Sequence, residues 1–265
     1  MAKRRTAKGR SGPATTGRGK PAPKGKSGNG GKEGAGKKAE RPRGGFRETG
    51  KMVLQVVVIF VIVRFFLIQT FVIDSGSMER TLLVGDFLLV NRAAMGSKVP
   101  LTGIRIPGYS EPRRGDVLVF DPPHDDTLIL VKRLVGMPGD TLQMRDKVLF
   151  LNDEAQDEPY VVLTRDRDGA DASMMWQQQI LLGGPRDDYW PTRDNWGPLV
   201  IPPERYFMLG DNRDTSLDGR MWGLIERWRF EGRVMAIYFS YNRNSLRPFP
   251  WLREIRWGRI FDRVR

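Results

Sequence analysis

Residues Met52–Ile73 form a single apolar run that constrains the fold of this chain more than any other feature. Its 22 residues are interrupted only by Gln55, Arg64, Gln69 and Thr70. As an α-helix the run would be roughly 33 Å long at about 1.5 Å per residue, enough to cross the hydrocarbon core of a bilayer. The long side chain of Arg64 can reach toward the headgroups. The run therefore predicts a transmembrane helix over residues 51–73.

Two alternatives to a membrane-spanning helix are open. One is a buried helix of a soluble domain, although the stretch 56–63 (VVVIFVIV) has no polar face. The second is a cleaved signal peptide. Its positive region would be far too long, and cleavage near Ser75 would destroy the serine-containing segment that follows.

The residues before the run are rich in Gly, Lys, Arg, Pro, Ser and Ala and lack a hydrophobic period. Such a segment cannot bury enough apolar surface to offset its ordering entropy, so residues 1–50 are predicted to be a disordered basic tail. Residues 1–51 hold 16 Lys/Arg and 3 Glu, which leaves 28 basic and 28 acidic residues in the rest. This positive charge places the tail in the cytoplasm and the chain after Ile73 outside it. The neutral remainder argues against a basic nucleic-acid-binding domain, but not against a tail that contacts RNA or anionic lipid.

Residues 74–265 show the pattern of an antiparallel β domain. Short β-rich segments alternate with turn formers, and no helical period is long enough for βαβ units. The expected strands are Phe87–Val90, Asp116–Phe120, Thr127–Val135, Lys147–Leu151, Tyr206–Leu209 and Arg233–Tyr241. The fold class is therefore mainly β, with a barrel-like or sandwich domain. Residues 152–200 are polar, Asp-rich and Trp-containing, and we interpret them as an inserted subdomain.

Cysteine is absent and His124 is the only histidine. The lack of cysteine excludes disulfides, Cys-based zinc sites and thiol nucleophiles. His124 lies in the cluster Asp-Pro-Pro-His-Asp-Asp, which is typical of a turn. A Ser-His-Asp triad would have to use this one residue, so an activated serine here is expected to rely on another base.

Lys132 is a candidate for that base. Strand alternation places Lys132 on the face of Leu130 and Leu134, while Arg133 points to the opposite face. Aliphatic surroundings favour the neutral amine, which is the form that can accept a proton from a serine hydroxyl. The alternative is an edge strand with the Lys132 side chain reaching water, and periodicity alone does not decide between the two.

A second polar segment, Gly210–Arg220, follows the expected strand Tyr206–Leu209. Its charges and hydroxyls are compatible with an Asx-turn loop, a calcium-binding loop or a structural ion-pair loop. The spacing of its aspartates does not match an EF-hand, and Arg213 and Arg220 would oppose a cation.

Four blocks of the sequence together resemble the bacterial type I signal peptidases, the membrane-anchored Ser/Lys proteases that remove signal peptides from exported proteins. The resemblance covers roughly residues 50–260. The blocks, in order, are Ser75-Gly76-Ser77-Met78 with Thr81-Leu82 and Gly85-Asp86; Arg114 to Phe120; Val131-Lys132-Arg133 through Gly136 to Asp140; and Gly210 to Arg220.

The resemblance implies a role for each residue of the site. It makes Ser77 the nucleophile and Lys132 the general base of an acyl-enzyme mechanism, without a metal or an organic cofactor. Ser75 would stabilise the oxyanion, and Ser216 would orient Lys132. Asp218 and Arg220 would brace the site. Ile73 and Val131 would line the pocket that takes the small side chain at position −1 of the substrate. It further implies preprotein signal peptides as substrates. The protein would be a single-pass protein of the bacterial inner membrane, with a cytoplasmic N-terminus and a periplasmic or extracytoplasmic catalytic domain.

Two residues depart from the family pattern. The family usually has proline before the threonine of the first block, where this chain has Arg80, and commonly has proline where this chain has Asp74. A catalytically impaired homologue is therefore one alternative. Another, based on the anchor and the basic tail, is a membrane-anchored β scaffold whose tail binds RNA or lipid. A self-cleaving Ser/Lys repressor would need a soluble DNA-binding domain before the β core, which the membrane segment and the tail argue against.

Overall fold

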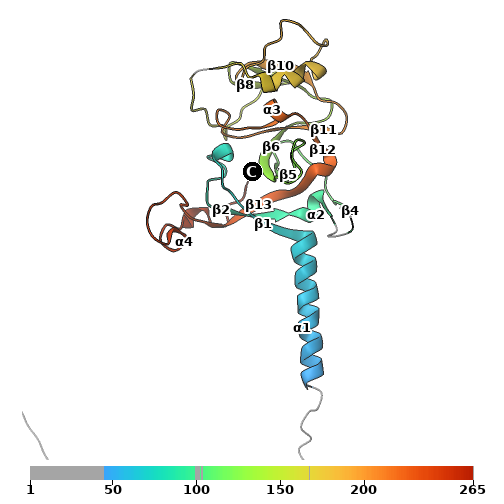
Figure 1. The fold of residues 1–265 in the computed structure, drawn as a ribbon, viewed down its shortest axis with the longest axis vertical. Helices are drawn as coiled ribbons and strands as arrows, with labels where there is room; N and C mark the ends of the chain where they lie inside the picture. The colour runs from blue at the N-terminus through green and yellow to red at the C-terminus, as the bar shows by residue number, and fades with distance from the viewer. Residues whose placement is uncertain (1–44, 99–101, 103, 167, 265) are drawn as a thin grey trace, which may run out of the picture. The chain divides into compact units, whose positions relative to one another are not determined.

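The computed structural model describes residues 45–98, 102, 104–166 and 168–264. Most of the predicted basic tail, residues 1–44, lies outside this part of the chain. The first element is the long helix α1 (Gly45–Ile62), followed by a π-helical turn, η1 (Val63–Leu67) (Figure 1). From Met52 to Ile62 the apolar side chains of α1 are exposed. Within the described residues, none of the helices combines the length and the apolar character needed to cross a membrane.

The predicted helix over 51–73 is wrong at its C-terminal end. Residues Ile68–Val72 form a strand, β1, which pairs antiparallel with β2 (Asp86–Asn91) from Ile68↔Asn91 to Val72↔Phe87. The β1 sequence Ile-Gln-Thr-Phe-Val is rich in β-branched and aromatic residues. Apolarity alone does not distinguish a buried helix from a strand, so the run Met52–Ile73 contained two elements of different type.

The described residues are mainly β, as predicted, with antiparallel pairing between the strands. The largest sheet has seven strands in the order β1-β2-β13-β5-β6-β11-β12. Its further members are β13 (Phe230–Ser240), β5 (Val117–Phe120), β6 (Leu130–Gly136), β11 (Arg205–Leu209) and β12 (Ile225–Glu226). Five of the six expected strands lie in this sheet, each displaced by a few residues at most at one or both ends.

A smaller sheet of four strands has the order β10-β7-β8-β9. It contains β7 (Thr141–Arg145), β8 (Val148–Leu151), β9 (Glu154–Ala155) and β10 (Trp196–Val200). Residues 152–200 thus contribute β9, β10 and the 3₁₀ segment η3 (Ala172–Ile180), and they share this sheet with 141–151. The subdomain interpretation of 152–200 stays a prediction.

Short elements complete the described chain. A two-stranded sheet joins β3 (Gly96–Lys98) to β4 (Arg105–Pro107). The short helices are α2 (Arg92–Met95), α3 (Gly219–Trp222) and α4 (Pro250–Arg253), and the remaining 3₁₀ turns are η2 (Gly76–Met78), η4 (Arg227–Arg229) and η5 (Trp257–Arg259).

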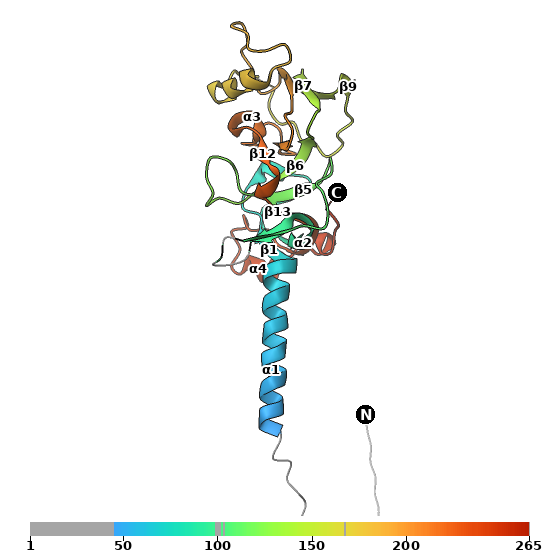
Figure 2. The same cartoon turned by 90° about the vertical axis from the view of Figure 1, so that its right-hand side faces the viewer.

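Buried apolar side chains hold the two larger sheets together. One cluster joins Leu142 of β7 and Leu199 of β10 to Phe207 of β11, so the smaller sheet packs against the β6–β11 end of the larger one (Figure 2). Another cluster includes Met78 and Leu82, which flank the turn after Ser77 and are fully buried. Burying each such side chain is worth about 1.5–3 kcal/mol, which fixes this turn to the core of the sheet.

Candidate active site

Ser77 lies in the 3₁₀ turn η2, between the end of β1 and the start of β2. The turn is closed by the Glu79 N–H, which donates to the Gly76 carbonyl at 3.1 Å, and by the Leu82 N–H, which donates to the Met78 carbonyl at 2.7 Å. Because Met78 is anchored in the core, the preceding Ser77 side chain is held partly buried at the edge of the sheet. The serine hydroxyl is therefore presented by rigid backbone.

Lys132 of β6 reaches this serine. Its Nζ donates to Ser77 Oγ at 2.7 Å and to the Val131 carbonyl at 3.1 Å, and the residue is only 3% exposed. Burial lowers the pKa of Lys132 from 10.5 to about 8, against the opposing effect of the Asp218, Asp211 and Asp74 carboxylates, which raise it. The amine is thus both in hydrogen-bond contact with the hydroxyl and far easier to deprotonate than an exposed lysine.

Ser75 lies two residues before Ser77 and is exposed. The two hydroxyl oxygens are 3.3 Å apart, so they are hydrogen-bonded. Ser75, Ser77 and Lys132 therefore form one continuous chain of polar atoms.

A small cavity of about 90 Å³ opens beside this chain. It is lined by residues Phe71–Ser75, Ser77 and Met78 from the β1 side and by Ile129–Lys132 from the β6 side. In the sheet three strands separate β1 from β6, so the sheet must curl to bring both to one cavity. Ile73 and Val131, the two residues predicted to line a substrate pocket, both border it, and so does Asp74.

The loop after β11 packs directly on the serine turn. The Asn212 N–H donates to the Ser77 carbonyl at 3.1 Å, and the Asn212 side chain donates to Glu79 Oε2 at the same distance. Gly210 approaches so closely that a Cβ there would lie 2.6 Å from the Ser77 carbonyl oxygen. Only glycine therefore allows this loop to support the backbone of the serine.

Asp218 and Arg220 form a fully buried ion pair at the end of the same loop. Arg220 Nε donates to Asp218 Oδ1 at 2.8 Å and Nη2 donates to Oδ2 at 2.9 Å, and Asp218 also accepts the Gly210 N–H at 3.0 Å. Burial favours the neutral acid, but Arg220 and the hydrogen bonds outweigh it and hold the pKa of Asp218 below 3.8. The pair braces the loop between Gly210 and α3.

Replacing Arg220 with leucine is expected to destabilise the protein by about 3–5 kcal/mol, because it leaves the Asp218 carboxylate buried without a counter-charge. The pKa of Asp218 is lower in the folded protein than in the unfolded chain. The pair therefore stabilises the wild type fully at pH values above the pKa of the unfolded chain, and this stabilisation is lost as the pH falls through the pKa of the folded protein. Urea denaturation at pH 7 measures the loss. Arg247→Leu is the control, since its pair with Glu254 is largely exposed and should cost less than about 1 kcal/mol. An equal loss in the two variants would contradict this interpretation.

Ser216 is buried, with 4% of its surface exposed. Its hydroxyl has no hydrogen-bond partner within the described part of the chain, although it lies close enough to Asp218 to help lower the pKa of that carboxyl. The hydrogen bonds of Lys132 Nζ go to Ser77 and Val131. Orientation of Lys132 by Ser216 therefore stays a prediction.

A second buried ion pair was not foreseen from the sequence. Arg133, on the face of β6 opposite Lys132, donates from Nε and Nη2 to the Asp211 carboxylate at 2.8 and 2.7 Å. Thr81 also donates its hydroxyl to Asp211. Strand parity separated Arg133 from Lys132, but nothing in the sequence indicated a partner 78 residues away.

The three aspartates of the Gly210–Arg220 loop each face an arginine. Asp211 pairs with Arg133, Asp214 with Arg193 and Asp218 with Arg220. Among the described residues, no group of three or more His, Cys, Asp or Glu side chains could hold a metal ion. The geometry favours an ion-pair loop here over a calcium-binding one.

Arg80 adopts a left-handed backbone conformation with φ of 77°. Proline is fixed near φ −65°, so the proline found at this position in the resembling family is incompatible with the local backbone here. Asp74 is exposed at the rim of the cavity. The two departures from the family pattern thus differ in kind: one changes the backbone and the other adds a charge.

The chain matches a protein-family model described as signal peptidase, peptidase S26, over residues 46–239. It is 33% identical over 219 residues to Signal peptidase I of Pseudomonas fluorescens, with 77% of this chain and 76% of that protein covered. Identity to Signal peptidase I of Pseudomonas aeruginosa is 34% over 212 residues, covering 73% and 72%. Signal peptidase I of Bacillus licheniformis is 32% identical over 193 residues, covering 72% and 88%.

Proposed function

The chain belongs to the signal peptidase family, peptidase S26, and we propose that it removes N-terminal signal peptides from exported preproteins with Ser77 as nucleophile and Lys132 as general base. The observation that carries the proposal is the 2.7 Å contact between Lys132 Nζ and Ser77 Oγ, made by a lysine that is 3% exposed. A neutral amine in this position accepts the hydroxyl proton as the oxygen attacks a carbonyl.

The proposed reaction uses these atoms in a fixed order. Ser77 Oγ attacks the scissile carbonyl carbon while its proton passes to Lys132 Nζ, giving a tetrahedral intermediate. The Ser77 N–H and the Ser75 hydroxyl stabilise the oxyanion, a contribution of about 3–4 kcal/mol per donor. The ammonium of Lys132 then protonates the departing amine as the peptide C–N bond breaks. Water, deprotonated by Lys132, hydrolyses the resulting ester and releases the signal peptide.

The free strand edges suggest how the substrate binds. β6 pairs with β5 at Leu130–Arg133, whereas its pairing with β11 begins only at Arg133. β1 is an outer strand of the sheet. An extended substrate segment can therefore add main-chain hydrogen bonds along these edges, which border the cavity beside Ser77.

The size of the cavity predicts the side chain accepted at the −1 position. The cavity beside Ser77 is small, about 90 Å³, and is bordered by the branched side chains of Ile73 and Val131, so we expect it to accept alanine more readily than leucine at the −1 position. A purified preprotein with alanine at −1 is expected to be cleaved after that residue, and one with leucine to be cleaved more than about a hundredfold more slowly. Electrophoresis and N-terminal sequencing of the product measure both. Equal cleavage of the two precursors would contradict the pocket assignment.

We further propose that the enzyme is attached to the cytoplasmic membrane of a bacterium through the apolar segment Met52–Leu67, with its catalytic residues on the extracytoplasmic side. The exposed valine, isoleucine and phenylalanine side chains of α1 support attachment, and the excess of Lys and Arg before Met52 supports the orientation. The full chain is expected to sediment with membranes, resist extraction by high salt and be released by detergent. Release by salt alone would contradict attachment through apolar contacts.

A further inference from the structure

Residues Glu158–Arg165, here called the strap, run alongside the loop Asp211–Asp214. The backbone of Val162 makes a parallel bridge to Asn212. The Val162 N–H donates to the Asp211 carbonyl at 2.8 Å, and the Arg213 N–H donates to the Val162 carbonyl at 3.1 Å. The strap therefore holds the main chain of the loop on both sides of Asn212.

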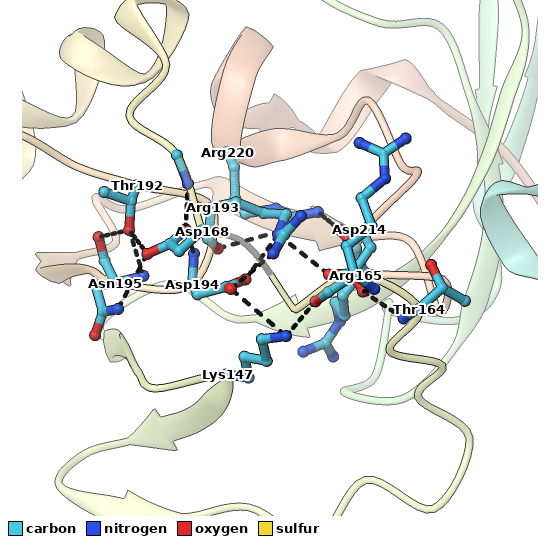
Figure 3. A network of polar contacts seen from close by, with 12 residues as sticks. Lys147, Thr164, Arg165, Asp168, Thr192, Arg193, Asp194, Asn195, Asp214 and Arg220 are labelled. Carbon is cyan, nitrogen blue, oxygen red and sulfur yellow. Dashed lines mark hydrogen bonds and ion pairs between the residues drawn. The ribbon is translucent and has the colours of Figure 1, made fainter.

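The end of the strap binds the side chain of Asp214. Asp214 Oδ2 accepts the Thr164 N–H and, at 2.6 Å, the Arg165 N–H, while Oδ1 lies 3.1 Å from Arg193 Nε. Figure 3 shows these groups converging on Asp214. Asp214 is 5% exposed, and these contacts hold its pKa below 3.8 despite burial, which acts in the opposite direction. The loop is thus clamped by a carboxylate that is ionised at neutral pH.

The beginning of the strap carries two more contacts. Glu158 forms an ion pair with Arg213 at 2.7 Å, in which the two side chains are 9% and 3% exposed. Tyr160 donates its hydroxyl to Glu158 at 2.8 Å, and its ring lies under the Arg133 guanidinium, 3.8 Å from ring centroid to Cζ. Since Arg133 binds Asp211, the strap contacts the loop residues Asp211, Asn212, Arg213 and Asp214 directly or through one side chain.

We propose that the strap is a positioning element for the nucleophile: it fixes the loop so that the Asn212 N–H holds the Ser77 carbonyl. This inference rests on the proposed function of Ser77. The connection is short, because the Asn212 N–H is 3.1 Å from the Ser77 carbonyl oxygen and the Val162 bridge constrains the backbone at that same residue. A displacement of the serine by about 1 Å can cost a hundredfold in rate.

The strap residues do not border the cavity next to Ser77. Loosening the strap should therefore lower kcat through misalignment of the hydroxyl and leave KM for a preprotein nearly unchanged. A merely structural role would instead lower thermal stability without changing kcat at temperatures where the variant is folded.

The test uses the full chain, purified in detergent, with kcat, KM and thermal unfolding measured for each variant. Glu158→Leu is expected to lower kcat by roughly tenfold to a hundredfold with KM within about threefold. Glu158→Gln keeps the one oxygen, Oε1, that accepts from both Arg213 and Tyr160, so it should retain kcat within about threefold. Glu231→Leu is the matched control, since Glu231 pairs with Arg92 at equal side-chain exposure of 9% but belongs to β13. It should lower stability and leave kcat unchanged.

Unchanged kcat in folded Glu158→Leu, or an equal fall in kcat for Glu231→Leu, would overturn the proposal. If Glu158→Leu does not fold, Tyr160→Leu takes its place, because the half-buried side chain of Tyr160 links Glu158 to Arg133. Tyr160→Leu should lower kcat about threefold to tenfold. Unchanged kcat in this variant would overturn the proposed role of the strap. A parallel Ser77→Ala sample separates the two hypotheses: if it retains activity, the proposed function fails, whatever the strap variants show.

Discussion

Replacing Ser77 with alanine is expected to lower kcat for preprotein cleavage by roughly 10⁶-fold, the order of magnitude lost when the catalytic serine of a serine protease is removed. In the proposed mechanism the Ser77 hydroxyl oxygen forms the acyl-enzyme, and we expect no neighbouring group to substitute for it. Ser75 lies 3.3 Å away by oxygen–oxygen distance, but its backbone is not held by the Asn212 N–H. Cleavage of a purified preprotein, followed over hours by electrophoresis, measures the loss.

Ser75→Ala is the informative companion variant. It removes the proposed oxyanion donor and leaves the proposed nucleophile, so its kcat should fall by about 10²- to 10³-fold. Both variants should unfold at nearly the wild-type temperature, because neither hydroxyl is deeply buried. If Ser75→Ala proves as inactive as Ser77→Ala, the separate roles of the two serines are not supported.

Lys132→Met is expected to reduce kcat by roughly 10⁴-fold or more, because methionine fills the same space without a basic atom. In the proposed mechanism the neutral amine of Lys132 is the active form, and burial lowers its pKa to about 8. Below that value log kcat/KM should therefore rise by about one per pH unit, and it should level off above it. A pH–rate profile from 6 to 10 measures this limb. A profile that is flat across this range would exclude Lys132 as the base.

Lys132→Met, which should lower activity, is expected to raise the stability of the folded protein. The folded-state pKa of Lys132 is lowered relative to 10.5, so the unfolded chain binds the proton more tightly and protonation at neutral pH opposes folding. Wild-type stability should rise between about pH 8 and 10.5 for this reason. Lys132→Met removes the penalty and should be more stable than the wild type at pH 7, with the difference shrinking above pH 8. Thermal unfolding of both proteins at pH 7 and pH 10 checks the sign.

Local patterns predicted those parts of the fold that depend on neighbouring residues. Alternation in Leu128–Val135 placed Lys132 and Arg133 on opposite faces of a strand, and in β6 the two side chains bind different partners, Ser77 and Asp211. The prediction failed at Ile68–Val72, because this segment was assigned from the length and apolarity of the whole run Met52–Ile73, whereas the strand is specified by its pairing with β2.

The sequence did not predict which side chains distant along the chain form ion pairs. The contacts Arg133–Asp211 and Glu158–Arg213 join residues 78 and 55 positions apart, and charge alone does not say which of many arginines faces which carboxylate. The resemblance to the signal peptidases did indicate the pair Asp218 and Arg220, which form an ion pair in the structure. The strap had no such signal, since its contact with Asn212 runs through backbone atoms that any residue carries.

Covalent labelling of the nucleophile tests the Ser77/Lys132 dyad most directly. The full chain is treated with an acylating serine-protease inhibitor between pH 6 and 10, and the modified residue and its rate of formation are measured by mass spectrometry. The predicted result is a single adduct on Ser77, formed at a rate that rises with pH to a half-maximum near 8, and no adduct in Lys132→Met. An adduct on another residue, or labelling of Ser77 at equal rates in the wild type and Lys132→Met, would contradict the dyad.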